Sequence, residues 1–213
     1  MTTIIIGGNK GGSSKSTTAC NLAVALALTE ADVCLVDADR QRSAARWHAD
    51  RESAAILPGI TLVEKYDNIA STLKSLEGRF DYVIVDVAGR NSRELITGAA
   101  VADVIVAPHQ CSQLDLDTMY ELQDQVVRIR DLNPKLKVLA YHTMASTNPA
   151  VRDAERQMFV EYLSDLPDIA CLESVSYYRK VYKDAMALGK SVLECDNPAA
   201  ANEVRSLVEE LFE

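Results

Sequence analysis

Two kinds of hydrophobic pattern alternate along the 213-residue chain. Short runs of β-branched and other apolar residues predict buried strands, and the longer stretches between them, with apolar residues every three or four positions, predict amphipathic helices. The predicted strands are Thr3–Ile6, Val33–Val36, Ile60–Val63, Tyr82–Val85, Val104–Ala107 and Lys137–Tyr141. The predicted helices are Ser16–Thr29, Ser43–Ser53, Leu114–Leu132, Pro149–Leu163, Tyr177–Leu188 and Pro198–Phe212.

This alternation is typical of a parallel sheet with crossover helices. The chain contains no internal repeat and no Pro-, Gly- or Ser-rich linker that would divide it. We therefore expect an α/β fold with a doubly wound, mostly parallel sheet flanked by helices, formed by one domain over residues 1–213.

Composition limits the partners that such a domain can have. The chain has 22 Lys and Arg against 31 Asp and Glu, a net charge of −9. Phosphate backbones bind positive surface, so this charge excludes a histone-like coating of nucleic acid. Any DNA binding would depend on a local basic patch, or on several such patches in an assembly.

The sequence predicts neither a membrane span nor a secretory leader. No apolar run reaches the roughly 18 residues that a transmembrane helix needs, and the N-terminus leads directly into a strand. The five cysteines are scattered without a CxxC pair, as is typical of reduced thiols. We expect a cytoplasmic protein.

A glycine-rich segment, GGNKGGSSKSTT at residues 7–18, joins the first predicted strand to the first predicted helix. A phosphate loop needs small residues, so that backbone N–H groups converge on phosphate oxygens, followed by a lysine for the phosphates and a hydroxyl for magnesium. Lys15 and Ser16 supply the lysine and the hydroxyl, but Asn9 and Ser14 stand where the strict GxxxxGK[ST] pattern has glycines. Taken alone, the segment fits either a phosphate loop or a glycine-rich turn without a ligand.

A second lysine, Lys10, makes the segment more specific, because KGGSSKSTT resembles the deviant Walker A box KGGxGK[ST]T of the ParA/MinD partition and positioning ATPases. Further segments resemble this family's NLA, DxDPQ, Walker B, ADxxxxP and Y…A…GxSVxE motifs in the same order. They are Asn21–Ala23, Val36–Gln41, Val83–Gly89, Ala102–Pro108 and Tyr182–Glu194. The resemblance implies a P-loop domain that hydrolyses ATP slowly, with ATP or ADP and Mg²⁺ as its ligands.

The resemblance also assigns roles to the loop. The phosphates would be held by small residues and one lysine, namely Gly11, Gly12, Ser13, Ser14 and Lys15. Ser16 would ligate Mg²⁺ and Thr17 would contact the α-phosphate. Lys10 would reach across a dimer to the partner's phosphates and supply positive charge during hydrolysis, as an arginine finger does.

Three aspartates complete the expected site. Asp39 would position the attacking water, so that Lys10, Lys15 and Asp39 are the catalytic candidates. Asp86 would hold Mg²⁺ through its water shell, and Asp37 would assist near the metal. Asp37 and Asp39 also follow a predicted strand and precede a predicted helix, so capping of that helix is an alternative role for both.

Two residues depart from the family pattern. Ser14 replaces a glycine where the backbone conformation is tight, so a Cβ there is expected to be strained and hydrolysis slower. Arg40 replaces the proline of DxDPQ, which loosens the turn after Asp39 and adds charge near the metal. We expect both departures to affect the rate of hydrolysis more than the fold.

The ends of the chain narrow the kind of family member that is expected. The phosphate loop begins within ten residues of Met1, so we expect no helix-turn-helix before it and no operator reading. Membrane-bound members end in a basic amphipathic helix. The last predicted helix instead carries four glutamates and one arginine on its polar face, and anionic lipid would repel it. We expect this helix to pack on the sheet and the protein to bind no membrane.

A basic cluster is the candidate for DNA binding. Its residues are Arg179, Lys180, Lys183 and Lys190, with tyrosines interleaved between residues 177 and 182. Backbone contacts from such residues give salt-sensitive binding without sequence preference, and a dimer would double the patch. Arg152 and Arg156 would extend it. The alternative is a solvated helix face with Tyr178 or Tyr182 in the core.

The resemblance therefore implies a switch. ATP would favour a homodimer, or a higher assembly, that binds nucleoid DNA. During plasmid or chromosome partition, a ParB-like adaptor would stimulate hydrolysis, and the protein would leave the DNA. Three alternatives stay open: a positioning ATPase for another cargo such as a carboxysome or chemotaxis cluster, a small-molecule ligase of the dethiobiotin synthetase kind, and a filament-forming scaffold with little hydrolysis.

Overall fold

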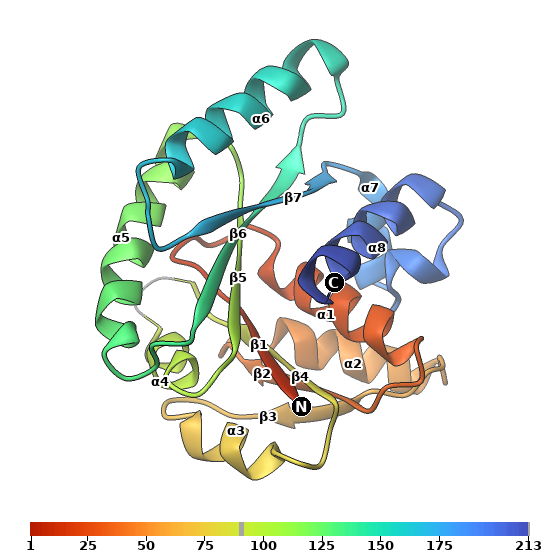
Figure 1. Cartoon of the computed structure of the whole chain (residues 1–213). Helices are drawn as coiled ribbons and strands as arrows, with labels where there is room; N and C mark the ends of the chain where they lie inside the picture. The colour runs from red at the N-terminus through yellow and green to blue at the C-terminus, as the bar shows by residue number, and fades with distance from the viewer. Residues whose placement is uncertain (90–91, 213) are drawn as a thin grey trace.

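The structure is a computed structural model that describes residues 1–89 and 92–212, without the side chains of residues 113–116. In this part of the chain, seven parallel strands form one sheet in the order β3-β2-β4-β1-β5-β6-β7 (Figure 1). The strands are β1 (Thr2–Ile6), β2 (Val33–Ala38), β3 (Thr61–Glu64), β4 (Tyr82–Val87), β5 (Val104–His109), β6 (Lys137–Ala145) and β7 (Ala170–Tyr177). The expected α/β fold with a doubly wound parallel sheet is confirmed.

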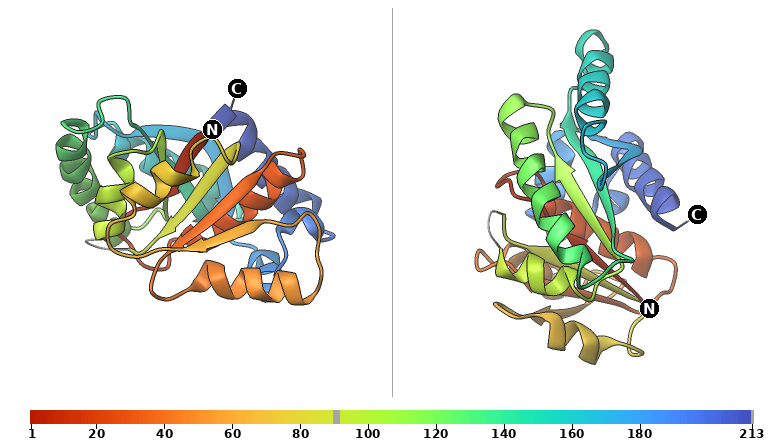
Figure 2. Two further views of the ribbon diagram at one scale, coloured as in Figure 1. Left: turned by 90° about the horizontal axis from the view of Figure 1, so that it is seen from below. Right: turned by 60° about the vertical axis from the view of Figure 1, so that its left-hand side comes forward.

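Helices cover both faces of the sheet (Figures 1 and 2). They are α1 (Lys15–Ala27), α2 (Ser43–Ser53), α3 (Ala70–Leu76), α4 (Arg93–Ala99), α5 (Gln113–Arg130), α6 (Pro149–Leu163), α7 (Lys180–Met186) and α8 (Pro198–Phe212), with a 3₁₀ turn, η1 (Val192–Glu194). Side chains of α3, α4, α5 and α6 fill the core on one face, and those of α1, α2 and α8 fill it on the other. A smaller cluster joins α1 to α7, η1 and α8.

The strand β1 shows how both cores form from one apolar run. Successive side chains of a strand point to opposite faces of the sheet. Ile5 therefore packs in the core of α3 to α6, while Ile4 and Ile6 pack in the core of α1, α2 and α8. All three are at most 1% exposed, which explains why the central strands are continuous apolar runs rather than alternating ones.

One strand, two helices and the turn η1 were not predicted, and α7 was predicted to begin three residues too early. The edge strand β7, with sequence ACLESVSY, is only partly buried and therefore lacks an apolar run. The helices α3 and α4 have seven residues each, too few for a helical period to stand out. Tyr177 ends β7, so α7 begins at Lys180 rather than at Tyr177.

The helix α8 packs on the sheet, as expected. Val204 and Leu207 are 3% and 2% exposed, and Phe212 makes an edge-to-face contact with Tyr82 of β4, with ring centroids 5.0 Å apart. Among the described residues, no helix has the length and apolar character needed to cross a bilayer.

The register of the central strands assembles the site. Asp37 of β2 is paired with Asp86 of β4, and Asp86 is paired with Ile6 at the end of β1, directly before Gly7. Both aspartates are the last but one residue of their strands, rather than following them. The carboxyl ends of three neighbouring strands thus bring two carboxylates to the start of the glycine-rich segment, the position where open α/β sheets bind ligands.

Candidate functional site

The glycine-rich segment forms an open loop between β1 and α1. Gly12 and Ser14 have positive φ angles of 77° and 69°, and Ser14 is the left-handed residue that precedes α1. This confirms that the backbone at Ser14 favours glycine, as the sequence suggested. A Cβ atom added at Gly11 or Gly12 would meet no atom within 4 Å, so the loop surface is free to receive a ligand, with the N-terminus of α1 beside it.

Side chains from neighbouring strands fix the shape of this loop. Thr143 Oγ1 of β6 donates a hydrogen bond to the Ser13 carbonyl, and Gln110 Nε2, after β5, donates to the Gly12 carbonyl, both at 3.2 Å. A Cβ at Gly89 would lie 3.0 Å from the Lys10 carbonyl oxygen, so glycine is needed where the loop after β4 passes. Sequence reasoning missed the bonds from Thr143 and Gln110, which lie within and directly after a strand and carry no local signal. Gly89 ends the segment that resembles Walker B, but the sequence assigned it no role.

Lys15 is almost buried within the loop that it follows. Its Nζ donates to the Lys10 carbonyl at 2.5 Å, and Ser13 Oγ donates to the same oxygen at 3.2 Å. Burial lowers the pKa of Lys15, while the charges of Asp86 and Asp39 act in the opposite direction. An ammonium held in this position is placed to neutralise phosphate charge above the loop.

Asp86 is a buried carboxylate that makes no well-formed hydrogen bond. It is 0% exposed, and neither carboxylate oxygen has a hydrogen-bond partner among the described residues. Burial raises its pKa to about 7, Asp37 and Asp39 add to the rise, and the Ser16 hydroxyl and Lys15 oppose it. A buried carboxylate with no partner is costly, so this group favours a cation or ordered water beside it.

The oxygen ligands that Ser16 and Asp86 provide fit Mg²⁺ bound together with a phosphate ligand. Mg²⁺ is usually held by one or two protein oxygens, several waters and the phosphates of a substrate, and Ser16 and Asp86 offer one hydroxyl and one carboxylate. The described residues contain no cluster of three His, Cys, Asp or Glu side chains that would form an all-protein metal cage.

Asp37 has a structural task beside Asp86. Its two oxygens accept backbone N–H bonds from Asp39 at 3.0 Å and from Ala45 in the first turn of α2 at 2.7 Å. The alternative of helix capping is therefore confirmed for Asp37, and its part in metal binding stays a prediction. Burial raises the pKa of Asp37, and the two N–H bonds partly offset this effect.

Asp39 lies at the rim of the site. It is half-buried, its Oδ1 accepts the Gln41 N–H at 2.8 Å, and the residue lines the pocket. Arg40, the departure from the family pattern, forms an exposed ion pair with Asp67 at 3.2 Å, so its charge is partly neutralised. Lys10 is half-buried in the loop, and its role toward a second copy stays a prediction.

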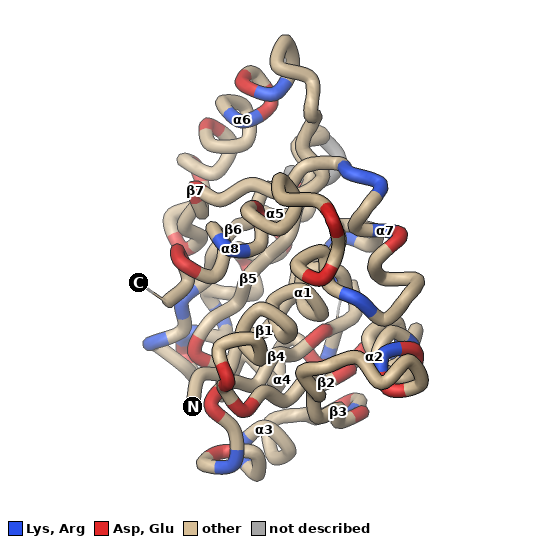
Figure 3. Tube along the Cα trace, turned by 90° about the vertical axis from the view of Figure 1, so that its right-hand side faces the viewer, with Lys and Arg blue, Asp and Glu red and all other residues tan. Residues whose placement is uncertain are grey.

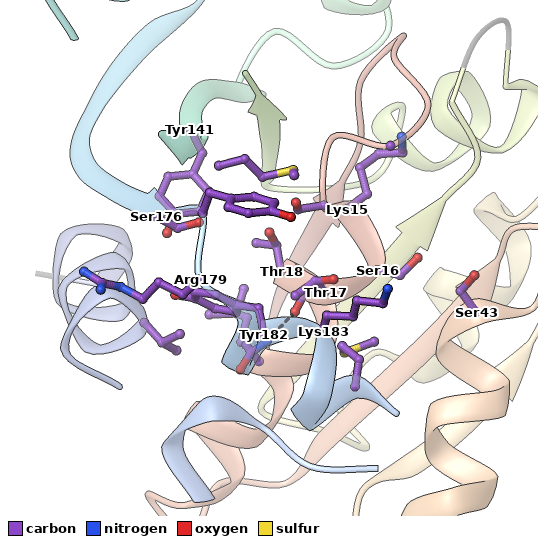
Figure 4. A pocket seen from close by; sticks show the side chains of 18 of the residues that line it. Lys15, Ser16, Thr17, Thr18, Ser43, Tyr141, Ser176, Arg179, Tyr182 and Lys183 are labelled. Atoms are coloured by element: carbon purple, nitrogen blue, oxygen red, sulfur yellow. Dashed lines mark hydrogen bonds between the residues drawn. The ribbon is translucent and has the colours of Figure 1, made fainter. Parts of the chain in front are cut away.

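The loop opens into a pocket of about 1060 Å³ (Figure 4). Most of the predicted phosphate-binding residues line it, together with Asp39, whereas Ser13, Asp37 and Asp86 are buried and do not. The opposite wall carries tyrosine side chains from β6, from β7 and the residue after it, and from α7: Tyr141, Tyr177, Tyr178 and Tyr182. Met144 also lines the pocket, beside the loop, where Gln110 Nε2 bonds to its Sδ and to the Gly12 carbonyl. An apolar wall facing a polar loop suits a ligand with a flat base and a phosphate chain.

Three residues of the basic cluster, Arg179, Lys180 and Lys183, line this same pocket. In Figure 4, Lys183 extends toward the side where Ser16 lies, and Arg179 points the other way. No local signal in the sequence connects this cluster with the loop. Lys190 lies apart from the pocket lining, and its carbonyl accepts the Trp47 indole N–H at 3.0 Å.

Acidic neighbours reduce the positive charge of the cluster (Figure 3). Arg179 Nε lies 2.6 Å from Glu203, and Lys180 lies 3.1 Å from Asp184. Tyr178 is 69% exposed, so it is not a core residue. Of the two proposed extensions, Arg156 donates to the Leu172 carbonyl at 2.6 Å, and Arg152 pairs with Asp153.

Comparison with known proteins supports these features. Residues 4–192 match the family model described as the CobQ/CobB/MinD/ParA nucleotide binding domain. A maintenance of carboxysome distribution protein A from Gloeobacter kilaueensis is 38% identical over 120 residues, 55% of this chain and 53% of the relative. A protein ParA from Rhizobium radiobacter is 28% identical over 156 residues, 73% of this chain and 69% of the relative. The chain spans about half to two thirds of the length of the first relatives that it matches.

Solved structures share the fold over nearly the whole chain. An ATP complex of a McdA variant from Cyanothece superposes with a TM-score of 0.82 at 17% identity, covering 99% of this chain and 96% of the other. A plasmid partition protein from Borrelia burgdorferi bound to AMPPNP gives a TM-score of 0.76 at 18% identity, covering 99% and 98%.

Proposed function

The chain belongs to the CobQ/CobB/MinD/ParA nucleotide-binding domain family, and from that premise we propose that it is a Mg²⁺-dependent ATPase that partitions or positions a cargo. One observation carries the proposal. An open loop of backbone amides and Lys15 lies beside the Asp86 carboxylate, which is buried and makes no well-formed hydrogen bond in the described part of the chain, with the Ser16 hydroxyl as its neighbouring donor.

Nucleotide binding is assigned to the residues that the loop presents. The backbone amides of Gly11 to Lys15 and the Lys15 ammonium hold the phosphates, and Thr17 contacts the α-phosphate. The tyrosines of the opposite wall receive the base. Ser16 and Asp86 hold Mg²⁺, with Asp37 fixing the neighbouring backbone. The bound ion adds positive charge at the phosphate oxygens.

Hydrolysis requires a positioned water molecule. Asp39 orients this water, its oxygen attacks the γ-phosphorus, and the bond from that phosphorus to the bridging β,γ oxygen breaks. The products are ADP and phosphate, and the proton that the water loses passes to the phosphate product or to solvent. Lys15 stabilises the charge that develops on the leaving oxygen, and Lys10 of a second copy adds charge from the other side. The left-handed backbone at Ser14 favours a slow rate.

ATP binding would be coupled to assembly. A nucleotide held between two copies stabilises the dimer over the monomer, so ATP shifts the population toward the dimer. The dimer presents two basic clusters to DNA, and a ParB-like adaptor stimulates hydrolysis and release. The names of the relatives support two cargoes equally: a DNA molecule undergoing partition, or a protein compartment such as a carboxysome. We place the protein in the cytoplasm, associated with the nucleoid.

The first experiment measures phosphate release from ATP with Mg²⁺ and with EDTA. We expect Mg²⁺-dependent turnover, and a loss of about a hundredfold in Lys15→Ala, because the Lys15 ammonium, held on the Lys10 carbonyl, is the charge placed at the phosphates. Lys74→Ala, on the exposed side of α3, is the matched control and should turn over as the wild type does. Equal rates in the two variants would overturn the proposal, and turnover that needs a small carboxylic acid would indicate a ligase instead.

The second experiment concerns the basic cluster. Lys183→Ala should weaken ATP-dependent binding to DNA by a similar factor for any sequence, and should make the salt dependence of binding shallower, since one phosphate contact is lost. Lys135→Ala is the matched control, because this exposed lysine precedes β6 at the other end of the strands. If both variants bind DNA as the wild type does while ATP affinity falls only in Lys183→Ala, the cluster serves the nucleotide rather than DNA.

A further inference from the structure

A buried polar network joins α1 to the segment between α7 and α8. Its centre is Asn21 of α1, which is 2% exposed. Asn21 Nδ2 donates to the Thr17 carbonyl at 2.7 Å, and its Oδ1 accepts the Ser191 hydroxyl at 2.8 Å and the Val192 N–H at 2.9 Å. One amide side chain therefore ties the first turns of α1 to the start of η1.

The same segment is tied to α2 through a buried ion pair. Arg51 of α2 is 0% exposed and makes two bonds to Glu194, at 2.8 and 2.9 Å. Its guanidinium also donates to the carbonyls of Gly189 and Pro58. Glu194 in turn accepts the Ser191 N–H at 2.8 Å, so the network runs without a break from Asn21 to Arg51.

The segment also fits closely against α2. Gly189 has a φ of +66°, and a Cβ there would lie 2.3 Å from the Arg51 backbone nitrogen. The neighbouring Lys190 carbonyl accepts the Trp47 indole N–H at 3.0 Å. No larger residue can replace Gly189 without moving the segment off the helix.

Both ends of the network reach the nucleotide site. Thr17, whose carbonyl Asn21 holds, lines the pocket directly after Ser16. The first turn of α2 is bonded through the Ala45 N–H to Asp37, which also fixes the backbone of Asp39. The network thus links α1, which begins at the phosphate loop, to α2, which follows the loop that contains Asp39.

We infer that Asn21, Ser191, Glu194 and Arg51 are positioning residues that keep Asp39 in register with the phosphate loop, an inference that rests on the proposed ATPase function. Buried polar groups tolerate little displacement, because each one that loses its partner is left desolvated and unpaired. α1 and α2 therefore move as one body. The segment begins directly after α7, so the same network ties the basic cluster to the nucleotide site.

The test compares Asn21→Ala and Ser191→Ala with Ser174→Ala. Ser174 is a matched control: it is 8% exposed, and its hydroxyl bonds to Glu210, which joins β7 to α8 outside the network. We expect the two network variants to lower kcat for ATP by about tenfold, with KM within about twofold of the wild type. The double variant should be little slower than Asn21→Ala alone, because the bond between the two residues is already lost in that variant and only the Ser191 bond to the Leu193 N–H is lost in addition. Ser174→Ala should lower thermal stability and keep kcat.

A rise in KM alone, equal losses of kcat in Ser174→Ala, or additive losses in the double variant would each overturn the inference. Hydrogen exchange separates this outcome from failure of the proposed function. With Mg²⁺ and ADP, exchange of residues 37–45 should slow in the wild type and in Ser174→Ala, and should not slow in Asn21→Ala. If the wild type does not hydrolyse ATP, the proposed function fails, and the exchange pattern still decides the inference: equal responses in all three proteins would overturn it.

Discussion

Buried charge lies at two places beside α1, the Arg51–Glu194 pair and the Asp86 carboxylate, and their hydrogen bonding differs. In the network that joins α1 to η1 and α2, Arg51 is bonded to Glu194 and to two backbone carbonyls. At the mouth of the loop, Asp86 is equally buried and has no partner among the described residues. A fully bonded cluster stabilises the arrangement of the helices, whereas an unpaired carboxylate is a cost to the fold that a bound cation would remove. The difference separates the scaffold of the site from its ligand-binding part.

The largest effect on stability should come from breaking the paired cluster. Glu194→Ala leaves the Arg51 guanidinium buried without its carboxylate, and we expect a loss of about 3 kcal/mol in the free energy of unfolding. Chemical denaturation at neutral pH measures this change. Glu209→Ala, an exposed glutamate of α8, is the control and should change the stability by less than about 0.5 kcal/mol. Equal stability of the two variants would mean that the ion pair does not hold the segment on α2.

Removing the charge of Asp86 should raise the stability of the fold, whereas breaking the Arg51–Glu194 pair should lower it. Asp86→Asn removes the buried charge, so in the absence of Mg²⁺ we expect the variant to be more stable than the wild type by about 2 kcal/mol at pH 8. Its ATP hydrolysis should fall by about a hundredfold, since an amide is a poor ligand for Mg²⁺. A variant that is less stable than the wild type without Mg²⁺ would show that the Asp86 carboxylate is satisfied within the fold.

The pH dependence of stability sharpens the same prediction. Burial raises the pKa of Asp86 to about 7, against about 3.9 for an unperturbed aspartate. The folded state therefore binds the proton more tightly than the unfolded state. The contribution of Asp86 to stability is complete below pH 4, and it is lost as the pH rises to about 7. Asp86→Asn should lack this decline, and a decline of equal size in both proteins would assign it to other groups.

The smallest effect concerns the backbone between the two clusters. Ser14 adopts a left-handed conformation with φ 69°, which costs a residue with a Cβ about 1 kcal/mol. Ser14→Gly should therefore raise the free energy of unfolding by about 0.5–1 kcal/mol and increase ATP turnover, as measured by denaturation and phosphate release. Ser14→Ala, which keeps the Cβ, is the control. A gain of the same size in both variants would contradict the explanation by backbone strain.

Local sequence was sufficient for the central sheet and the loop. Runs such as Tyr82–Val85 are apolar because both faces of these strands are buried, and Lys15 and Ser16 follow small residues because a phosphate loop needs both. The edge strand β7 and the helix α4 were not predicted, because one is partly exposed and the other spans only seven residues. The positions of these two elements depend on packing against distant parts of the chain, and their own sequences show no hydrophobic period.

For the site, the amino-acid sequence alone identified the phosphate loop, the family that it resembles, and the aspartates near the ends of β2 and β4. Only the tertiary structure placed the basic cluster of α7 on the wall of the same pocket and joined Asn21 to Ser191, 170 positions apart. It also showed that Asp37 is bonded to two backbone amides, while Asp86 makes no well-formed hydrogen bond to the residues that the structure describes. The physical reason is that motifs follow from the short-range chemistry of neighbouring residues. Pairing, burial and pKa depend on which distant side chains the fold brings within hydrogen-bond distance.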